Sequence, residues 1–259
     1  MPLVGWEVDG VVYDLDQVAA LARAGELVGG RWPAEVLAAL ADQPRDPYRL
    51  RASDLGDCLR QKVLEHYEPY TLRPDDRWEA LVGTGVHAVL ARSSDPDSLV
   101  EVRLSALLPV DGETLTISGQ IDRYHRPSRT LTDYKTTGSV VRVGRPGPDH
   151  SYVLQANAYV WLLRQHGEDP VRARLWFVER QGSVSRATGR RQVRSRLVEV
   201  DLMDPKAFED RLVEIGRTLL AAHREGKLPP ALPADHPFCR WCPVVEACRQ
   251  LEQESGGAG

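Results

Sequence analysis

The sequence lacks several features that would assign it to large classes of protein. Every apolar run is interrupted by Arg, Asp or Glu well before the roughly 20 residues that cross a bilayer. The first residues do not combine a basic region with an apolar run, so we expect no secretory signal and an intracellular, cytoplasmic protein with no membrane partner. A Gly-x4-Gly-Lys-Ser/Thr phosphate loop is also missing, which argues against a built-in nucleotide-driven helicase.

Lysine is scarce, and the overall charge is mildly acidic. Only four of the 33 basic residues are lysines, and 37 acidic residues give a net charge of −4, which excludes a histone-like polycation. Hydrophobic residues make up 42% of the 259 residues and charged residues 27%, so a largely disordered or fibrous chain is excluded as well. Length and composition together predict one globular domain with embellishments and a sizeable core, with two independent domains as the less favoured alternative.

Turn signals and hydrophobic periodicity divide the chain into three parts. Asp9-Gly10 stands between short alternating runs and predicts a hairpin, and apolar-periodic stretches at 16–27 and from about residue 33 predict two short helices. The chain ends in a Ser/Gly-rich segment that predicts a flexible end. The predicted parts are an N-terminal helical appendage of unknown role (1–50), a main domain (51–252) and a flexible tail (253–259).

The main domain mixes helices with strands. Ser53 is a candidate helix cap, with Cys58 one turn into the helix, and Asp111-Gly112 predicts a turn between strands. The expected helices are 54–67, 76–92, 152–165 and 204–226. The expected strands are 99–108, 114–124 and 130–136, forming an antiparallel three-stranded sheet, followed by 171–181 and 192–202.

Two acidic residues and a lysine are expected at one edge of this sheet. Asp122 ends one strand, and Asp133-Tyr134-Lys135 lies on the next, where alternation places Asp133 and Lys135 on the same face. Neighbouring carboxylates repel unless they are neutralised, and Mg²⁺ or Mn²⁺ prefers such oxygen ligands. The metal could activate water for attack on a phosphodiester, with Lys135 stabilising the developing charge. A surface hairpin with an ion pair has the same sequence pattern.

Further residues strengthen the nuclease interpretation. His87 follows Gly83 by four residues upstream of the sheet, and Gln155 and Tyr159 share one face of the helix after it. Each has an ordinary alternative, a core or surface histidine and a capping Gln/Tyr pair. Their joint occurrence in the order His, Asp, Asp-x-Lys, Gln-x3-Tyr favours a shared site.

All four cysteines fall into one pattern. Cys239, Cys242 and Cys248 form Cys-x2-Cys-x5-Cys near the end of the chain, and Cys58 lies far upstream. Four thiolates suit either tetrahedral Zn²⁺ or an iron–sulfur cluster. Zinc ribbons bring two close pairs, so three clustered ligands and one remote one favour a [4Fe–4S] cluster, with zinc as the alternative.

From about Ser53 to Cys248 the motifs resemble the PD-(D/E)xK nuclease superfamily, and more narrowly its RecB/AddB-type iron–sulfur exonucleases, including CRISPR-associated and phage RecB-like members. The resemblance implies an α/β fold with a central mixed sheet flanked by helices, a restriction-endonuclease-like core and a C-terminal iron–sulfur region. The roles it implies are metal ligands at His87, Asp122, Asp133 and the Tyr134 carbonyl, catalysis by Lys135 with both aspartates, DNA contacts at Gln155 and Tyr159, and cluster ligands at Cys58, Cys239, Cys242 and Cys248.

The chain also departs from this family. Members more often carry Glu where Asp133 stands, and a shorter carboxylate would shift the metal or leave a water in its coordination shell. Leu59 stands where Pro commonly follows the first cysteine, which affects helix geometry only. Glu101 is a candidate acid facing a second metal position, and an exposed strand residue is the alternative.

Arginines gather between residues 172 and 196, with a loop predicted at 182–191. DNA affinity depends on local positive surface, so the negative net charge does not exclude DNA as a partner. The loop arginines Arg186, Arg190 and Arg191 are candidate phosphate contacts, and a solvated arginine-rich hairpin is the alternative.

The sequence therefore predicts a metal-dependent DNA exonuclease acting on single strands or duplex ends. The expected processes are recombination, repair, replication or CRISPR adaptation, with a helicase, recombinase or CRISPR adaptation protein as partner. A non-catalytic DNA-binding or scaffolding subunit with the same fold is the alternative, because Asp133 replaces Glu and the chain is acidic.

Overall fold

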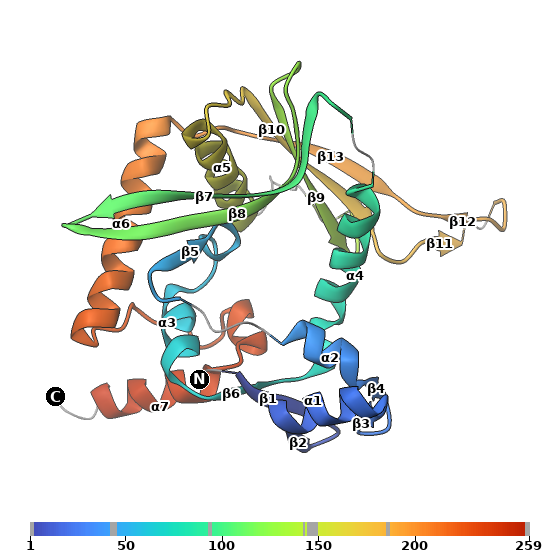
Figure 1. Ribbon diagram of the computed structural model, residues 1–259, viewed down its shortest axis with the longest axis vertical. Helices are drawn as coiled ribbons and strands as arrows, with labels where there is room; N and C mark the ends of the chain where they lie inside the picture. The colour runs from blue at the N-terminus through green and yellow to red at the C-terminus, as the bar shows by residue number, and fades with distance from the viewer. Residues whose placement is uncertain are drawn as a thin grey trace. The chain divides into compact units, whose positions relative to one another are not determined.

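The computed structural model describes residues 3–41, 46–92, 95–141, 143, 150–184 and 187–256 (Figure 1). The chain folds into two units. Their bounds are residues 1–47, 57–81 and 218–259 for the first, and residues 48–56 and 82–217 for the second. The division into appendage, main domain and tail stays a prediction.

The first unit surrounds a small sheet in the order β2-β1-β6, antiparallel between β1 and β2 and parallel between β1 and β6. Its strands are β1 (Leu3–Val8), β2 (Val11–Asp14), β3 (Leu27–Val28), β4 (Trp32–Pro33) and β6 (Tyr70–Leu72). Its helices are α1 (Leu15–Ala24), α2 (Ala34–Leu40), α3 (Leu59–Tyr67), α7 (Val245–Gly256) and the 3-10 helix η2 (Pro237–Trp241).

Local signals account for the start of this unit. Asp9 and Gly10 have φ values of 50° and 81°, the left-handed conformations that a tight hairpin requires, so the predicted turn is confirmed. The Asp14 side chain accepts from the Gln17 N–H and the Gln17 side chain accepts from the Asp14 N–H, which caps α1. The two short helices expected from the apolar periodicity are thus present as α1 and α2.

The first unit has its own hydrophobic core. Trp6, Leu37 and Leu64 are buried in it, and Val244 and Leu251 bring the C-terminal segment against it. Helix α7 was not predicted, because the sequence placed the last helix before the cysteines. Helix α7 continues through Gly256, into the segment expected to form the tail.

The second unit is built on a six-stranded mixed sheet in the order β13-β10-β9-β8-β5, with β7 pairing to β8. Its strands are β5 (Arg49–Arg51), β7 (Ser98–Val110), β8 (Glu113–His125), β9 (Thr130–Thr137), β10 (Arg172–Glu179), β11 (Ser183–Val184), β12 (Arg191–Gln192) and β13 (Ser195–Val200). Its helical segments are η1 (Ala52–Asp54) and α5 (His150–Gln165). Two longer helices, α4 (Pro74–Leu90) and α6 (Pro205–Glu225), each begin in one unit and end in the other.

The sheet confirms the predicted α/β class. Strands β7, β8 and β9 are antiparallel neighbours as expected, whereas β9 pairs in parallel with β10 and β5 in parallel with β8. Helix α5 packs against β7, β8, β9 and β10, and the β11–β12 hairpin extends beyond the ends of β10 and β13 (Figure 1). The loop expected at 144–149 lies outside the described residues. None of the described helices has the length and apolarity needed to cross a membrane.

The predicted helix at 54–67 was wrong at its start. Residues 52–54 form the separate 3-10 helix η1, and α3 begins at Leu59 with Cys58 as its N-cap. Cys58 is therefore the flanking residue of the helix and does not lie within its first turn. Gly56 separates the two segments, where a side-chain carbon would lie 2.2 Å from the Ser151 Cβ of α5.

Candidate functional site

The two long strands β7 and β8 are interrupted where they carry acidic residues. They pair from Ser98–His125 to Val110–Glu113, but Glu101 and Asp122 are left out of the ladder. Glu101 has a φ of 51°, a left-handed conformation that costs a non-glycine residue of order 1–3 kcal/mol. Such strain persists only where surrounding contacts hold the residue in place. The side-chain contacts of Glu101 therefore deserve a close description.

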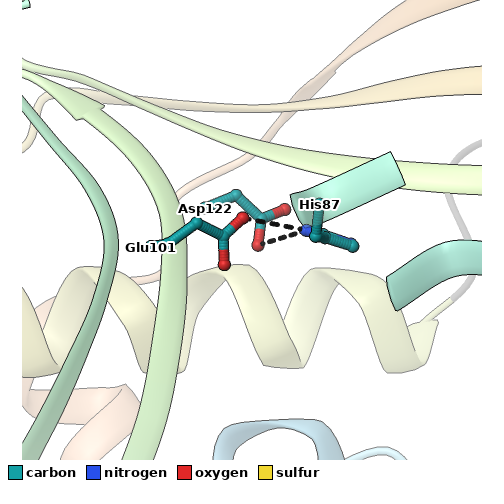
Figure 2. A group of neighbouring side chains, drawn as sticks. All are labelled: His87, Glu101 and Asp122. Atoms are coloured by element: carbon teal, nitrogen blue, oxygen red, sulfur yellow. Dashed lines mark hydrogen bonds and ion pairs between the residues drawn. The ribbon is translucent and has the colours of Figure 1, made fainter. Parts of the chain in front are cut away.

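Glu101, Asp122 and His87 converge from β7, β8 and α4, as Figure 2 shows. His87 Nδ1 lies 3.2 Å from Glu101 Oε1 and 3.2 Å from Asp122 Oδ1. The hydrogen bond to Asp122 is the main factor that raises the pKa of His87 to about 9, although partial burial opposes it. One imidazole nitrogen and two carboxylates are thus held together.

The donor atoms of these three residues fit a divalent cation. One potential ligand atom from each lies within 4.8 Å of the others. Two ligand atoms bound to Mg²⁺ at about 2.1 Å can be no more than about 4.2 Å apart. The three side chains would therefore need to move only slightly closer together to bind the ion. Carboxylate oxygens suit Mg²⁺ and Mn²⁺. His87 and Asp122 were predicted from the sequence as ligands, and the third member is Glu101, which the sequence offered as a candidate acid facing a second metal position.

Asp133 belongs to an adjoining set of contacts. Its buried carboxylate lies 2.8 Å from Lys135 Nζ, and Asp133 is not among the three residues of Figure 2. Burial raises the pKa of Asp133 to about 7; the positive charge of Lys135 opposes this shift, and the Asp122 carboxylate adds to it. Asp122 Oδ2 also accepts the N–H of Tyr134 at 2.5 Å, which joins β8 to β9 beyond their last paired residues.

Lys135 is held from the far side by helix α5. Its ammonium donates to Gln155 Oε1 at 2.8 Å, and Gln155 Nε2 donates to the Tyr159 hydroxyl at 2.7 Å. The Tyr152 ring lies 5.3 Å from the same ammonium. Burial lowers the pKa of Lys135, but the nearby Asp133 carboxylate outweighs this effect and the net shift is upward. Lys135 is therefore a fixed positive charge beside the carboxylates.

The Gln155–Tyr159 pair lies where the sequence placed it, on one face of α5. Burial raises the pKa of Tyr159, so its hydroxyl stays protonated. The Tyr159 ring packs on Gly119, where an added side-chain carbon would lie 2.6 Å from the ring. Among the described residues, the pair contacts Lys135 through Gln155 and the sheet through the Tyr159 ring.

The four cysteines lie together in the first unit and are free. They line one pocket with Leu64, Phe238 and Val244 among its other residues. Cys58 caps α3, Cys239 and Cys242 lie in and directly after η2, and Cys248 lies in α7. Burial raises the pKa of Cys242 to about 11.

The spacing of the cysteine sulfurs bears on the metal that they suit. Among the described residues, His87, Glu101 and Asp122 form the one group of three metal-binding side chains with ligand atoms all within 4.8 Å, so no three cysteine sulfurs come that close. Sulfurs bound to one tetrahedral Zn²⁺ at 2.3 Å are only about 3.8 Å apart. In any three of these cysteines, at least one pair of sulfurs is therefore farther apart here than in a zinc-bound site.

The arginines expected to contact DNA lie at the β11–β12 hairpin. Arg190 and Arg191 are exposed, and no hydrogen bond or ion pair joins their guanidinium groups to another residue of the described chain. Arg186 lies outside the described residues. Between residues 180 and 198 the sequence has six arginines and no acidic residue.

Two contributors to the site were not identified from the sequence. Gln120 donates to Glu101, and Tyr152 faces Lys135. Gln120 precedes Asp122 by two residues on a strand, which was a usable signal for a shared face. Nothing in the local sequence marks Tyr152, because its role depends on how α5 packs on β9.

Comparison with known proteins identifies the family. The profile described as the PD-(D/E)XK nuclease superfamily matches residues 19–249. This protein belongs to the PD-(D/E)XK nuclease superfamily, whose members use divalent metal ions. No curated protein sequence matches the chain significantly.

One solved structure shows the same fold at low sequence identity, and two others are less similar. SSO0001 is 15% identical and superimposes with a TM-score of 0.54, covering 83% of this chain and 91% of that one. A phage-related exonuclease from Haemophilus somnus 129PT gives a TM-score of 0.43 at 11% identity over 69% of this chain and 96% of its own. An alkaline exonuclease from Laribacter hongkongensis gives 0.35 at 12% identity, over 69% and 93%.

Proposed function

We propose that this protein is a metal-dependent DNA exonuclease that hydrolyses phosphodiester bonds of single-stranded DNA or duplex ends. The observation that carries the proposal is the convergence of His87, Glu101 and Asp122 next to the Asp133–Lys135 ion pair. Separate surface charges would not account for buried carboxylates that share a site with a fixed ammonium. Superfamily membership supports the same reading.

The residues divide the hydrolytic work between them. His87, Glu101, Asp122 and Asp133 are the proposed ligands of Mg²⁺ or Mn²⁺, with the Tyr134 carbonyl as a further one. Bound there, the ion would polarise the phosphate and lower the pKa of water. Lys135, fixed by Asp133 and Gln155, would orient the attacking water and stabilise negative charge as a P–O bond breaks. The released oxygen takes up a proton and the water oxygen stays on phosphorus.

The proposed DNA contacts extend from the site to the hairpin. Gln155 contacts Lys135 and is the proposed DNA contact nearest the scissile phosphate, and Tyr159, the second proposed contact, accepts a hydrogen bond from Gln155. Arg190 and Arg191, with Arg186, supply charges that suit the phosphate backbone farther from the cut. The β11–β12 hairpin is thereby proposed as a backbone contact that carries no sequence preference.

For the cysteine pocket we propose a [4Fe–4S] cluster, which would place the chain in the RecB/AddB-like iron–sulfur group. Support comes from the pocket that all four thiols line and from sulfur spacings wider than a zinc site requires. Cys58 and the three C-terminal cysteines would hold the start of α3 to η2 and α7. The proposed processes are recombination, repair, replication or CRISPR adaptation, with a helicase, recombinase or adaptation protein supplying the DNA.

Cleavage of end-labelled DNA tests the nuclease. Single-stranded, duplex and closed circular substrates are incubated with Mn²⁺, Mg²⁺ or EDTA. We expect metal-dependent shortening of the linear substrates and no cutting of the circles. Lys135→Ala should slow cleavage by about 100- to 1,000-fold, the usual effect of removing one charge-stabilising donor. Lys206→Ala is the matched control, because Lys206 is an exposed lysine of α6 that contacts Asp210.

The possible outcomes separate the two functions considered. Cleavage that survives both Lys135→Ala and Asp122→Ala would refute the proposed site. Tight DNA binding with no cleavage by the wild type under any metal would favour the non-catalytic DNA-binding subunit. Circular dichroism checks that each variant is folded. When its lysine partner is removed, Asp133 can take up a proton, which limits the loss of stability in the Lys135 variant.

Metal analysis tests the cysteine proposal independently. Protein purified without oxygen should be brown and contain about four iron atoms and four sulfides per chain. Cys248→Ser should lose this iron. A colourless protein with one zinc per chain would refute the cluster and leave the nuclease proposal standing.

A further inference from the structure

Glu101 depends on a second residue for its orientation. Its strained backbone leaves the side chain held by two contacts, one to each carboxylate oxygen. Glu101 Oε1 lies 3.2 Å from His87 Nδ1, and Oε2 accepts a hydrogen bond of 2.7 Å from Gln120 Nε2. A ligand that bonds the metal through one oxygen is commonly fixed through its other oxygen, and Gln120 occupies that place.

The Gln120 amide has a defined orientation. Gln120 Oε1 accepts from Arg103 at 3.3 Å, and Arg103 faces Gln120 across the β7–β8 ladder. A guanidinium has donors only, so it requires the amide oxygen, while the Glu101 carboxylate requires the amide N–H. The two charged neighbours therefore impose one amide orientation, in which the donor points at Glu101.

We propose that Gln120 is a positioning residue that sets the metal affinity of this site by holding Glu101 in its ligand orientation. The inference rests on the proposed function, because it takes the His87–Glu101–Asp122 group as the metal site. Removing such an outer contact typically weakens metal binding by about 10- to 100-fold. Arg103 acts one contact farther out, by fixing the amide.

Gln120 is suited to a clean test because its side chain is exposed. Its replacement leaves no cavity in the core. Gln120→Met keeps the length of the side chain and removes the N–H donor. Thr114→Val is a matched control, since Thr114 is an exposed residue of the same strand.

The protein is purified with its cysteine site loaded. It is then titrated with Mn²⁺ in a calorimeter. Asp122→Ala defines any binding that occurs elsewhere. We expect Gln120→Met to raise the Mn²⁺ dissociation constant by about 10- to 100-fold, with Thr114→Val unchanged. In the Glu101→Ala background the same substitution should have no further effect, because a residue that acts through Glu101 has nothing left to position.

Two results would overturn the inference. One is an unchanged dissociation constant in Gln120→Met, and the other is an equal loss with and without Glu101. Both would leave the nuclease proposal intact. Conversely, a wild type that binds Mn²⁺ with the expected dependence on Gln120 but cleaves no DNA would refute the nuclease alone. A wild type with no Asp122-dependent Mn²⁺ binding would overturn both.

Discussion

Gly119 offers a sharp test of how the sheet supports the proposed catalytic residues. An added Cβ at this position would lie 2.6 Å from Cε1 and 3.0 Å from Cδ1 of Tyr159, and 3.1 Å from the Ala52 Cβ. Carbon atoms in contact are normally about 3.5–4.0 Å apart, so the ring or the strand must move by about 1 Å. Only 6% of Tyr159 is exposed, so the ring has little room to move.

The magnitude of the effect follows from this geometry. Overpacking a buried contact costs about 1–3 kcal/mol, so Gly119→Ala should lower the free energy of unfolding by that amount. The Tyr159 hydroxyl accepts from Gln155, which in turn accepts from Lys135. A displacement of about 1 Å can reduce a rate by about 100-fold, and we expect DNA cleavage to fall to that extent.

Gly85→Ala is the matched control. Gly85 lies in α4 and has nothing within 4 Å of an added side-chain carbon. Alanine in a helix is favoured over glycine by about 0.5–1 kcal/mol, so this change should stabilise the protein slightly. Urea unfolding and cleavage of labelled DNA measure both variants. The reasoning fails if Gly119→Ala matches the wild type, or if its penalty is as large in a Tyr159→Ala background, where the obstructing ring is gone.

Two further predictions concern other parts of the chain. Burial and the nearby His66 lower the pKa of His223 below its ordinary value of 6.5, so below about pH 6.5 the unfolded state binds more protons and stability should decline as the pH falls. His223→Gln should flatten that decline in urea unfolding. Replacing Arg190 and Arg191 together by Ala should reduce the slope of log affinity for duplex DNA against log salt by about 1.8, measured by fluorescence anisotropy. An unchanged slope would exclude both arginines from phosphate contact.

The parts of the fold that sequence reasoning recovered are those with local causes. Asp111 and Gly112 have φ values of 49° and 86° at the turn between β7 and β8, and the sequence marks this turn because few other residue pairs accept that conformation. Alternation then predicts the strands on both sides. The antiparallel order of β7, β8 and β9 follows because short turns join them.

The missed elements depend on partners far away in the sequence. Strand β5 has three residues and exists because it pairs in parallel with β8, more than sixty positions downstream. Strand β6 likewise pairs in parallel with β1. Such short segments carry no periodicity of their own, so their assignment as strands comes from tertiary pairing.

The candidate site shows the same limit at the level of single residues. Spacing alone predicts that Asp133 and Lys135 share a face, and in the structure Lys135 Nζ lies 2.8 Å from Asp133 Oδ2. The alternating pattern around Glu101 predicts an ordinary continuous strand. The left-handed backbone at Glu101 occurs together with contacts to His87 and Gln120, which belong to different elements, and no local rule predicts it.

The short side chain of Asp133 and the strained backbone of Glu101 are related features of the site. A glutamate at 133 would carry its carboxylate one methylene farther from β9, whereas Asp133 stays buried beside Lys135 and does not join His87 and Asp122 within 4.8 Å. Glu101 provides the longer carboxylate from β7 and completes that group. A strand residue with regular geometry would keep Glu101 in the ladder opposite Asp122, so leaving the ladder is what frees its side chain for two polar contacts. The strain at Glu101 and the short side chain at 133 therefore belong to one arrangement of the acidic residues.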